Sequence, residues 1–527
     1  MRRRGAAADR DCTRSRCGEY TPPAWQIPIR RRALSSPDSA SRYSSCNRPA
    51  KDGRDRVQRR RVVMAKVDSS PALTVGAGRH LLAAALLAAG MIAGQGAQAE
   101  TLMSALSSAY VSNPTLNAAR ANLRAVDELV PQALSGWRPQ VFGEGAVRQS
   151  HTSTTPGGSL DLTTSTIGVT VTQPLFRGFR TVNSTKQAEA TVRANRASLS
   201  NTEQNVLFDS VQVYMAVLTN QAIVELQRQN IEVLTEQLRA TRDRFQVGEV
   251  TNTDVAQAEA ALSGAYTQLN LAEADLLTSK AQYRQIIGRD PVNLTPAVPA
   301  RSLPSSLDEA VRLSQANHPA IIAAVYAEEA SAYQVKVVEG TLLPTLTLQG
   351  SVDYTNNPSA SVDSSASASI MAQLTIPIYQ GGIEYSQVRE AKELRTERTM
   401  QIDATRANVR QAVASAWGSL EAATASIASA QAQVKAAQIA LNGVREEANV
   451  GQRTTLDVLN AEQTLLDARV SLVQAESARV VASYALLSAV GQLSAERLAL
   501  AVDYYQPERH YQQVRDKWFG LRTPSGQ

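Results

Sequence analysis

The chain has 527 residues, enough for about three domains of ordinary size, and only 5% of them are aromatic, which argues against a compact globular enzyme. The formal net charge of +6 is unevenly distributed: of the 54 basic and 48 acidic residues, 19 and 7 lie in residues 1–99, so that the remainder carries 35 basic and 41 acidic residues and a net charge of −6. All three cysteines, Cys12, Cys17 and Cys46, also lie in residues 1–99, which excludes disulfide and thiol chemistry from the rest of the chain.

Residues 64–99 are predicted to form a secretory signal peptide. A basic segment is followed by an apolar run over 81–92 and by an Ala-x-Ala cleavage motif that ends at Ala99. The run is shorter than the ~20 residues that a membrane-spanning helix needs. The mature chain is therefore expected to begin at Glu100, and because this residue is not cysteine, no lipoprotein processing is expected.

Residues 1–63 differ in character from the rest of the chain, since they are rich in Arg, Pro and Ser and lack apolar periodicity. Because a signal peptide belongs at the start of a chain, we predict that Met64 is the true start and that residues 1–63 are not translated. The alternative is a disordered basic arm. Its arginine runs are typical of nucleic-acid-binding segments, but such an arm has no use in front of an export signal, and we expect no nucleic-acid partner.

The exported part is predicted to contain two copies of one unit. Asn113-Pro114 recurs as His318-Pro319 at an offset of 205 residues, and Val247-Gly248 recurs as Val450-Gly451 at an offset of 203. The stretch Gln-Pro-Leu-Phe-Arg-Gly that begins at Gln173 likewise returns as Ile-Pro-Ile-Tyr-Gln-Gly. Repeats at a constant offset indicate a duplicated fold. The expected divisions are a first repeat over 100–290, a junction over 291–306, a second repeat over 307–493 and a tail over 494–527.

Each unit is predicted to run helix, strand, strand, very long helix, break, long helix. No Gly or Pro occurs from Thr181 to Val247, and these 67 residues would span ~100 Å as one helix. After each break, apolar residues recur every seven positions, which predicts helices packed as coiled coils. The expected helices are 101–130, 180–246, 252–287, 307–339, 382–448 and 455–490.

Four short segments alternate strictly between apolar and polar residues, at about 141–150, 166–175, 346–355 and 369–378. Nine or ten residues suit a tilted strand that crosses a membrane, although the same alternation fits a soluble sheet with one wet face. The polar segments 149–165 and 355–368 are expected to be extracellular loops. Four strands cannot close a barrel, and an open edge cannot lie in lipid. A membrane location therefore requires an oligomer, and the residues alone allow a dimer, a trimer or more.

With these features in this order, residues 100–500 resemble the TolC-like outer-membrane factor family. The most specific matches are the stretch NPTLNAARANLRAVDELVPQALSGWRPQV, the echo of VTQPLFRGF in LTIPIYQGG, and the pair FQVGEVTNTDV and NVGQRTTLDVLNAEQTLL. The resemblance implies a mostly α-helical chain with a small membrane β-barrel portion. Three copies would form a twelve-stranded barrel in the outer membrane and a long helical tunnel in the periplasm. The junction 291–306 and the segment after residue 494 would form a belt around the middle of the tunnel.

The resemblance also implies function and partners. The expected function is an outer-membrane channel that exports drugs, amphiphiles or proteins, with outer-membrane lipid around its barrel. A periplasmic adaptor (membrane fusion) protein would link it to an inner-membrane pump or ABC transporter. The residues fit multidrug efflux and type I secretion equally well. The alternative is a structural coiled-coil envelope protein or adhesin, anchored in the outer membrane by a few strands.

The two breaks between the long helices carry the candidate site. At each of them a Thr lies three residues before an Asp, at Thr251 and Asp254 and at Thr454 and Asp457, and this spacing predicts a capping box at the start of the second helix. In an oligomer, Asp457 would form a ring of carboxylates that attracts cations and raises its own pKa.

By the resemblance, these breaks would be the periplasmic gate. Arg453 matches the tip arginine that helps to hold the closed state, and Asp254 matches an acidic latch residue. The family has a second acid where this chain has Asn460 and a tyrosine where it has Ala448, so weaker cation block and one missing latch contact are expected. The adaptor would contact the two tip triplets, which are Val247-Gly248-Glu249 and Val450-Gly451-Gln452.

No residue pattern in the exported part indicates an enzyme. His151, His318 and His510 have no metal-ligand spacing, and no catalytic or nucleotide-binding motif occurs. The adjacent Glu446 and Glu447 are assigned to a solvated helix face. We therefore expect no catalytic residues, no cofactor and no bound metal apart from a possible cation site in the ring of Asp457.

Overall fold

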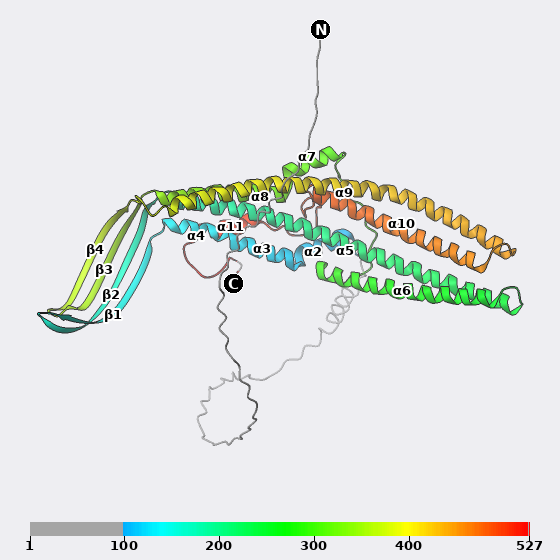
Figure 1. Cartoon of the computed structure of the whole chain (residues 1–527), viewed down its shortest axis with the longest axis horizontal. Helices are drawn as coiled ribbons and strands as arrows, with labels where there is room; N and C mark the ends of the chain where they lie inside the picture. The colour runs from blue at the N-terminus through cyan, green and yellow to red at the C-terminus, as the bar shows by residue number, and fades with distance from the viewer. Residues whose placement is uncertain (1–98, 525, 527) are drawn as a thin grey trace, which may run out of the picture. The chain divides into compact units, whose positions relative to one another are not determined.

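The computed structural model describes residues 99–524 and 526. The predicted signal peptide and residues 1–63 lie outside this part of the chain. Within it the chain is mostly helical, with one small sheet at one end of the long helices (Figure 1). No helix in the described range is both long enough and apolar enough to cross a membrane.

The order of elements is the same in the two halves of the described chain, except that the first half has one additional short helix before its strands. The first half runs α2 (Leu102–Ser112), α3 (Pro114–Asp127), α4 (Leu129–Leu134), η1 (Ser135–Trp137), β1 (Gln140–Thr154), β2 (Gly158–Arg177), α5 (Arg180–Gln246) and α6 (Asn252–Ile287). The second half runs α7 (Leu307–Asn317), α8 (Pro319–Glu339), η2 (Gly340–Leu342), β3 (Thr345–Ser359), β4 (Val362–Thr375), α9 (Ile383–Asn449) and α10 (Thr455–Ala489), followed by α11 (Pro507–Val514).

The first helix of each half is broken, where the sequence predicts single helices over 101–130 and 307–339. The breaks fall at Asn113 and His318, whose backbones are extended. Both precede a proline, which disfavours helical geometry in the residue before it. Each then caps the following helix: Asn113 accepts hydrogen bonds from Thr115 and Leu116 N–H, and the His318 ring accepts one from Ala320 N–H.

The long helices form a layer in which α6, α5, α10 and α9 lie in this order. Helices α5 and α9 have 67 residues each, which corresponds to ~100 Å. Helix α10 contacts both α5 and α9, whereas α6 packs mainly on α5. Small residues form the buried seam of α6 at Ala258, Ala265 and Ala272 and allow the helices to approach closely. Because α5 and α10 are the inner helices of this layer, α6 and α9 form its two edges.

The main apolar core lies where the amino-terminal helices meet the middle of this layer. Three tyrosines, Tyr214, Tyr283 and Tyr484, are among its largest buried side chains. The buried carboxylate of Glu100 accepts hydrogen bonds from the Tyr283 hydroxyl at 2.5 Å and from Arg289 Nη2 at 2.6 Å. The backbone of Glu100 also bridges to Leu294. These bonds fasten the junction segment to the helices.

The strands are longer than predicted. The sequence indicates polar loops over 149–165 and 355–368, but most of those residues continue the strands, and the two hairpins turn tightly at 155–157 and 360–361. Ser and Thr dominate these segments, and Thr favours extended backbone; Gly158 supplies a positive φ of 86° after the first turn. Strand β4 ends at Thr375 rather than near 378 because Pro377 cannot donate to the ladder.

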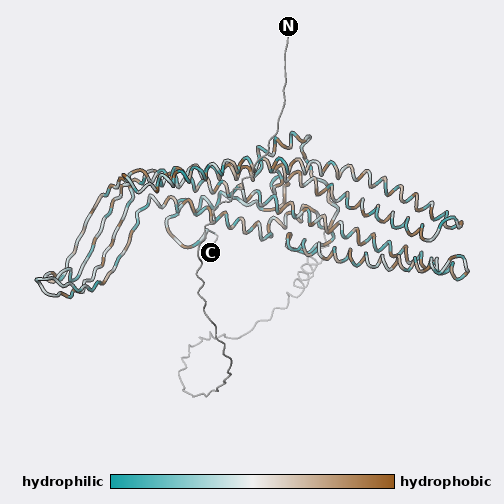
Figure 2. The backbone as a smooth tube through the Cα atoms, viewed as in Figure 1, coloured by the Kyte–Doolittle hydropathy of each residue, from teal (hydrophilic) through white to brown (hydrophobic). Residues whose placement is uncertain are grey.

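The register of the four antiparallel strands, in the order β1-β2-β3-β4, gathers the apolar residues on one face. Val141 lies opposite Val171, Val169 opposite Val352, and Gly350 opposite Ile370. Side chains of opposed residues point to the same face. Apolar and polar residues accordingly alternate along the strands in Figure 2. The members of this apolar face are Val141, Val147, Ile167, Val169, Val171, Leu346, Leu348, Val352, Tyr354, Ile370 and Leu374.

Candidate functional site at the helix–turn–helix tips

Both long hairpins end in the same turn. At the first tip, Gly248 has a φ of 81°, and at the second, Gly451 has a φ of 79°. Glu249 N–H donates to Arg244 O and Gln452 N–H donates to Glu447 O, each at 2.9 Å. This is the Schellman arrangement, in which a residue with positive φ lets the last carbonyls of a helix find donors. Glycine is needed at this position because it tolerates the left-handed backbone.

Each turn leads directly into a complete capping box. Thr251 N–H donates to Asp254 Oδ2 at 2.9 Å, and Asp254 N–H donates in return to Thr251 Oγ1 at 3.4 Å. Thr454 and Asp457 form the same pair of bonds, at 3.0 and 3.3 Å. The acidic side chain in the first turn also complements the positive end of the helix dipole.

The caps set the protonation of both aspartates. The Thr251 hydroxyl and then its backbone N–H lower the pKa of Asp254, and the Thr455 hydroxyl from the second hairpin lowers it further. The backbone N–H and then the hydroxyl of Thr454 lower the pKa of Asp457. A ring of like charges would raise the pKa of Asp457, so within one copy the cap acts in the opposite direction.

Arg453 contacts an acid that the sequence assigns to a solvated helix face. Its Nε donates to Glu447 Oε2 at 2.8 Å, and this bond raises the pKa of the Arg453 guanidinium. Both side chains are about half exposed, so the pair is screened and contributes little to stability. The first tip reverses the order of charges, because Arg244 in the helix donates to Glu249 in the turn at 3.1 Å.

A further ion pair is duplicated and was missed by sequence analysis. Arg242 pairs with Glu259 across the first hairpin, and Arg445 pairs with Glu462 across the second. In each pair the two partners are 17 residues apart in the sequence, and the second pair follows the first at the repeat offset of 203. A search for oppositely charged residues that recur at this offset would have found them. They join the two helices of each hairpin near its tip.

The two tips enclose a polar cavity of about 630 Å³. Arg244, Arg445 and Arg453 line it together with Glu249 and Asp254. Asp254 and Arg453, which the sequence places in different repeats, therefore meet at one site. Asn460 lies on the exposed surface of α10, one turn beyond Asp457, and does not line this cavity. In both tip triplets the valine, the glycine and the polar residue are exposed, and Val247 and Val450 are about 70% accessible.

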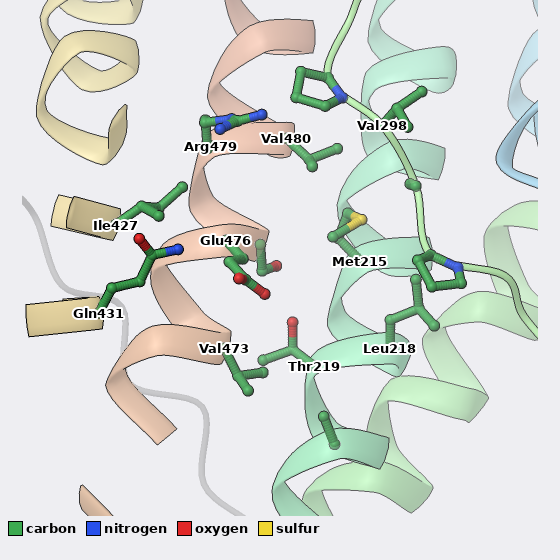
Figure 3. Close-up of a pocket in the computed structure, with 15 residues that line it drawn as sticks. Met215, Leu218, Thr219, Val298, Ile427, Gln431, Val473, Glu476, Arg479 and Val480 are labelled. Carbon is green, nitrogen blue, oxygen red and sulfur yellow. The ribbon is translucent and has the colours of Figure 1, made fainter. Parts of the chain in front are cut away.

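A second cavity, of about 540 Å³, lies where the junction segment crosses α5 and α10 (Figure 3). Met215, Leu218, Val298 and Val480 make its lining mostly apolar, and Glu476 is the acidic residue that lines it. Among the described residues no group of His, Cys, Asp and Glu has the arrangement of a metal site.

Comparison with known proteins identifies the family to which the chain belongs. The sequence profile of the family described as outer membrane efflux protein matches residues 105–289 and 310–492. The chain belongs to the outer membrane efflux protein family. It is 46% identical over 450 residues to the outer membrane efflux protein BepC of Brucella suis, covering 85% of this chain and 98% of BepC. It is 25% identical over 425 residues to the outer membrane protein TolC of Escherichia coli, covering 76% and 84% of the two chains.

The fold is also that of a solved outer membrane channel. The CmeC channel of Campylobacter jejuni superposes with a TM-score of 0.68 at 17% identity, covering 79% of this chain and 89% of CmeC. This protein is therefore an export channel of the outer membrane that extends into the periplasm, as the resemblance implies. The sequence-based assignment to the TolC-like family is confirmed.

Proposed function

We propose that three copies of this chain close into one twelve-stranded barrel that continues as a helical tunnel. The observation that supports this most directly is the four-stranded sheet, which has one apolar face and, among the described residues, unpaired edges at β1 and β4. Unpaired backbone groups cannot lie in hydrocarbon, so the free edge of β4 must pair with β1 of another copy. Two copies would give only the eight strands of the narrowest barrels, whereas three give twelve.

The helical layer supports the same closure. Helices α6 and α9 lie at its opposite edges, and each packs mainly on the inner helix beside it along the hairpins. Exposed apolar side chains occur on both helices, among them Leu277 on α6 and Ile439 on α9. Helix α9 of one copy would pack against α6 of the next, which covers these side chains and closes the tunnel around the same axis as the barrel.

The tips are proposed as the gate and as the docking site for a periplasmic adaptor. The exposed valines of the two triplets give an apolar contact at the end of each hairpin. Asp254, Arg453 and Asp457 lie at the same end, where three copies would bring three sets together. Asp457 is held ionised by its cap, and Asn460 adds no charge, so the ring would carry one negative charge per copy. Opening the gate would separate the two hairpins of each copy.

Through the adaptor, the channel would receive drugs, amphiphiles or proteins from an inner-membrane pump or ABC transporter. We assign it no chemical step: the tip side chains that cluster are charged and capping residues, and their hydrogen bonds account for them as structural and electrostatic groups. The cargo would be selected by the pump, and the channel would supply a water-filled path across the periplasm and the outer membrane.

Conductance of the purified protein in planar lipid bilayers tests the proposal, with native mass spectrometry to count the copies. We expect a trimer that opens a discrete pore. A protein that binds membranes without conductance would instead support the adhesin alternative, and a monomer in detergent would contradict the barrel. Deletion of the gene should raise sensitivity to drugs and detergents or remove proteins from the secretome, and loss of neither would contradict an export role.

A further inference from the structure

The carboxyl-terminal segment after α11 contains an exposed apolar loop. Trp518 is 60% exposed, Phe519 is 87% exposed and Leu521 is fully exposed. Gly520, with a φ of 115°, turns the chain between them. Lys517 closes the loop, because its ammonium donates to the carbonyl of Arg522 at 2.6 Å. Three large apolar side chains within four residues are costly to leave in water, and they require a partner.

Hydrogen bonds hold this segment along the amino-terminal helices. Tyr505 N–H donates to the Tyr110 hydroxyl at 3.0 Å, and the His510 ring bonds Asp127 at 2.8 Å. Arg138 Nη1 then donates to the Lys517 carbonyl at 2.9 Å. Residue numbers rise together along both partners, so the tail runs parallel to α2, α3 and α4. Figure 1 shows α11 beside α3, which it contacts.

These contacts define the path of the tail. The resemblance implies a belt around the middle of the tunnel that includes the segment after residue 494, and the portion before α11 packs into the central core through Ala495 and Leu500. Lys517 and Trp518 reach the base of the sheet, where both contact Arg138. Two ion pairs hold the preceding residues along α5: Arg515 pairs with Glu189 at 3.5 Å and Glu508 pairs with Arg196 at 3.0 Å.

The tail reaches the edge of the apolar face at Lys517 and Trp518. The Arg138 guanidinium lies 4.8 Å from the centre of the Trp518 ring. Arg138 precedes Val141, the first residue of the apolar face, by three positions, which is at most about 10 Å along an extended chain. The headgroup layer on each side of a bilayer is about 5–8 Å thick. A barrel that spans the hydrocarbon with this face therefore holds Trp518 at the level of the periplasmic headgroups.

We propose that the loop 517–522 is an interfacial anchor that inserts Trp518, Phe519 and Leu521 into the periplasmic leaflet of the outer membrane. The inference rests on the barrel proposed above. Trp is enriched at membrane interfaces because its ring is apolar and its N–H is polar. Lys517 and Arg522 flank the apolar residues, and basic residues near a surface are attracted to anionic lipid. The anchor fixes the height and tilt of the tunnel.

Tryptophan fluorescence with lipid-borne quenchers tests this in the full exported chain. Trp137→Phe combined with Trp417→Phe leaves Trp518 as the only tryptophan after residue 99. The protein is reconstituted into vesicles of phosphatidylethanolamine and phosphatidylglycerol that contain lipid with a shallow doxyl label. We expect blue-shifted Trp518 emission that the doxyl lipid quenches more strongly than aqueous iodide does. A matched variant that retains only Trp417, on the long helix α9, should show the opposite preference.

A further variant separates failure of this anchor from failure of the barrel. Ile370→Trp, in a chain with no other tryptophan, reports from the apolar face on β4. If that tryptophan is quenched by doxyl lipid and Trp518 is reached only by iodide, the anchor is wrong and the barrel stands. Protection of Trp518 from both quenchers also overturns the anchor, because it means that a second copy covers the loop. If doxyl lipid quenches neither tryptophan, the barrel is wrong and the anchor falls with it.

Discussion

A single charge on the apolar face of the sheet should prevent stable insertion, whereas the same charge one residue away should not. Ile370 on β4 is 84% exposed and lies opposite Gly350, in the row that continues through Val171 and Val141 on the other two strands. Ser369 points to the other face, where its hydroxyl bonds that of Ser351 at 3.0 Å. Ile370→Lys and Ser369→Lys therefore place the same charge on the two sides of one strand.

The cost follows from the depth of Ile370. On the apolar face of β4, residues 366, 368, 370, 372 and 374 form an uninterrupted apolar run between Ser364 and the end of the strand, and residue 370 is the middle one of that run. Lysine on the lipid face of a barrel costs about 2–4 kcal/mol near the bilayer midplane and little on the lumen face. At 1.36 kcal/mol for each factor of ten, this is a loss of about 30- to 900-fold in the folding equilibrium per copy. A trimer would incur the cost three times.

Reversible folding into phospholipid vesicles, followed by urea titration, measures the difference. Ser369→Lys serves as the control, since it carries the same side chain and the same charge at almost the same depth. We expect this control to fold like the unmodified protein and to alter the ion selectivity of the pore. Equal destabilisation by the two lysines, or no destabilisation by either, would show that the two faces do not divide lipid from water.

Three further outcomes are expected at the tips and the junction. Asn460→Asp should tighten block of the pore by divalent cations in bilayer recordings, because it doubles the acids in the ring of Asp457; unchanged block would retire the ring. The lowered pKa of Asp457 contributes stability above its unfolded value of about 3.9, and this is lost as the pH falls through the folded value, so protection from hydrogen exchange in the first turn of α10, relative to the intrinsic rate at each pH, should fall at acidic pH in the unmodified chain but not in Asp457→Asn. Glu100→Gln should cost about 1–3 kcal/mol in urea unfolding, because Tyr283 and Arg289 lose a charged acceptor, whereas Glu446→Gln on the exposed face of α9 should cost nothing measurable.

The long helices and the tip caps are the parts of the structure that local sequence predicts well. A helix without Gly or Pro, such as α5, needs only a seam of small residues to pack, and its ends carry their own signals. The capping pair of Thr454 and Asp457 is complete within four residues, so no distant contact is needed to define it. The same holds for the turn at Gly451, where positive φ selects glycine.

Local sequence predicts the breaks in the first helix of each half and the lengths of the strands less well. Prolines at 114 and 319 are compatible with either a helix start or a kink, and the extended backbones of Asn113 and His318 in the structure show that a new helix starts there. The hairpins were expected to be loops because polar residues suit solvent. A strand that projects beyond a membrane is also polar, so composition does not distinguish it from a loop. The cross-strand pairing in the structure shows that these segments are strands. Sequence does not predict the pair of Arg453 and Glu447, because the turn at Gly451 brings the two side chains together.

The sequence by itself determined the family, the duplication, the helical character and the residues at each tip, since each of these depends on periodicity or on contacts within a few positions. Tertiary structure alone decided that the apolar residues of four strands share one face, that Asp254 and Arg453 line one cavity, and that Lys517 and Trp518 of the tail lie at the base of the sheet. These are relations between segments hundreds of residues apart. They are fixed by register and by long-range packing, which a local pattern does not encode.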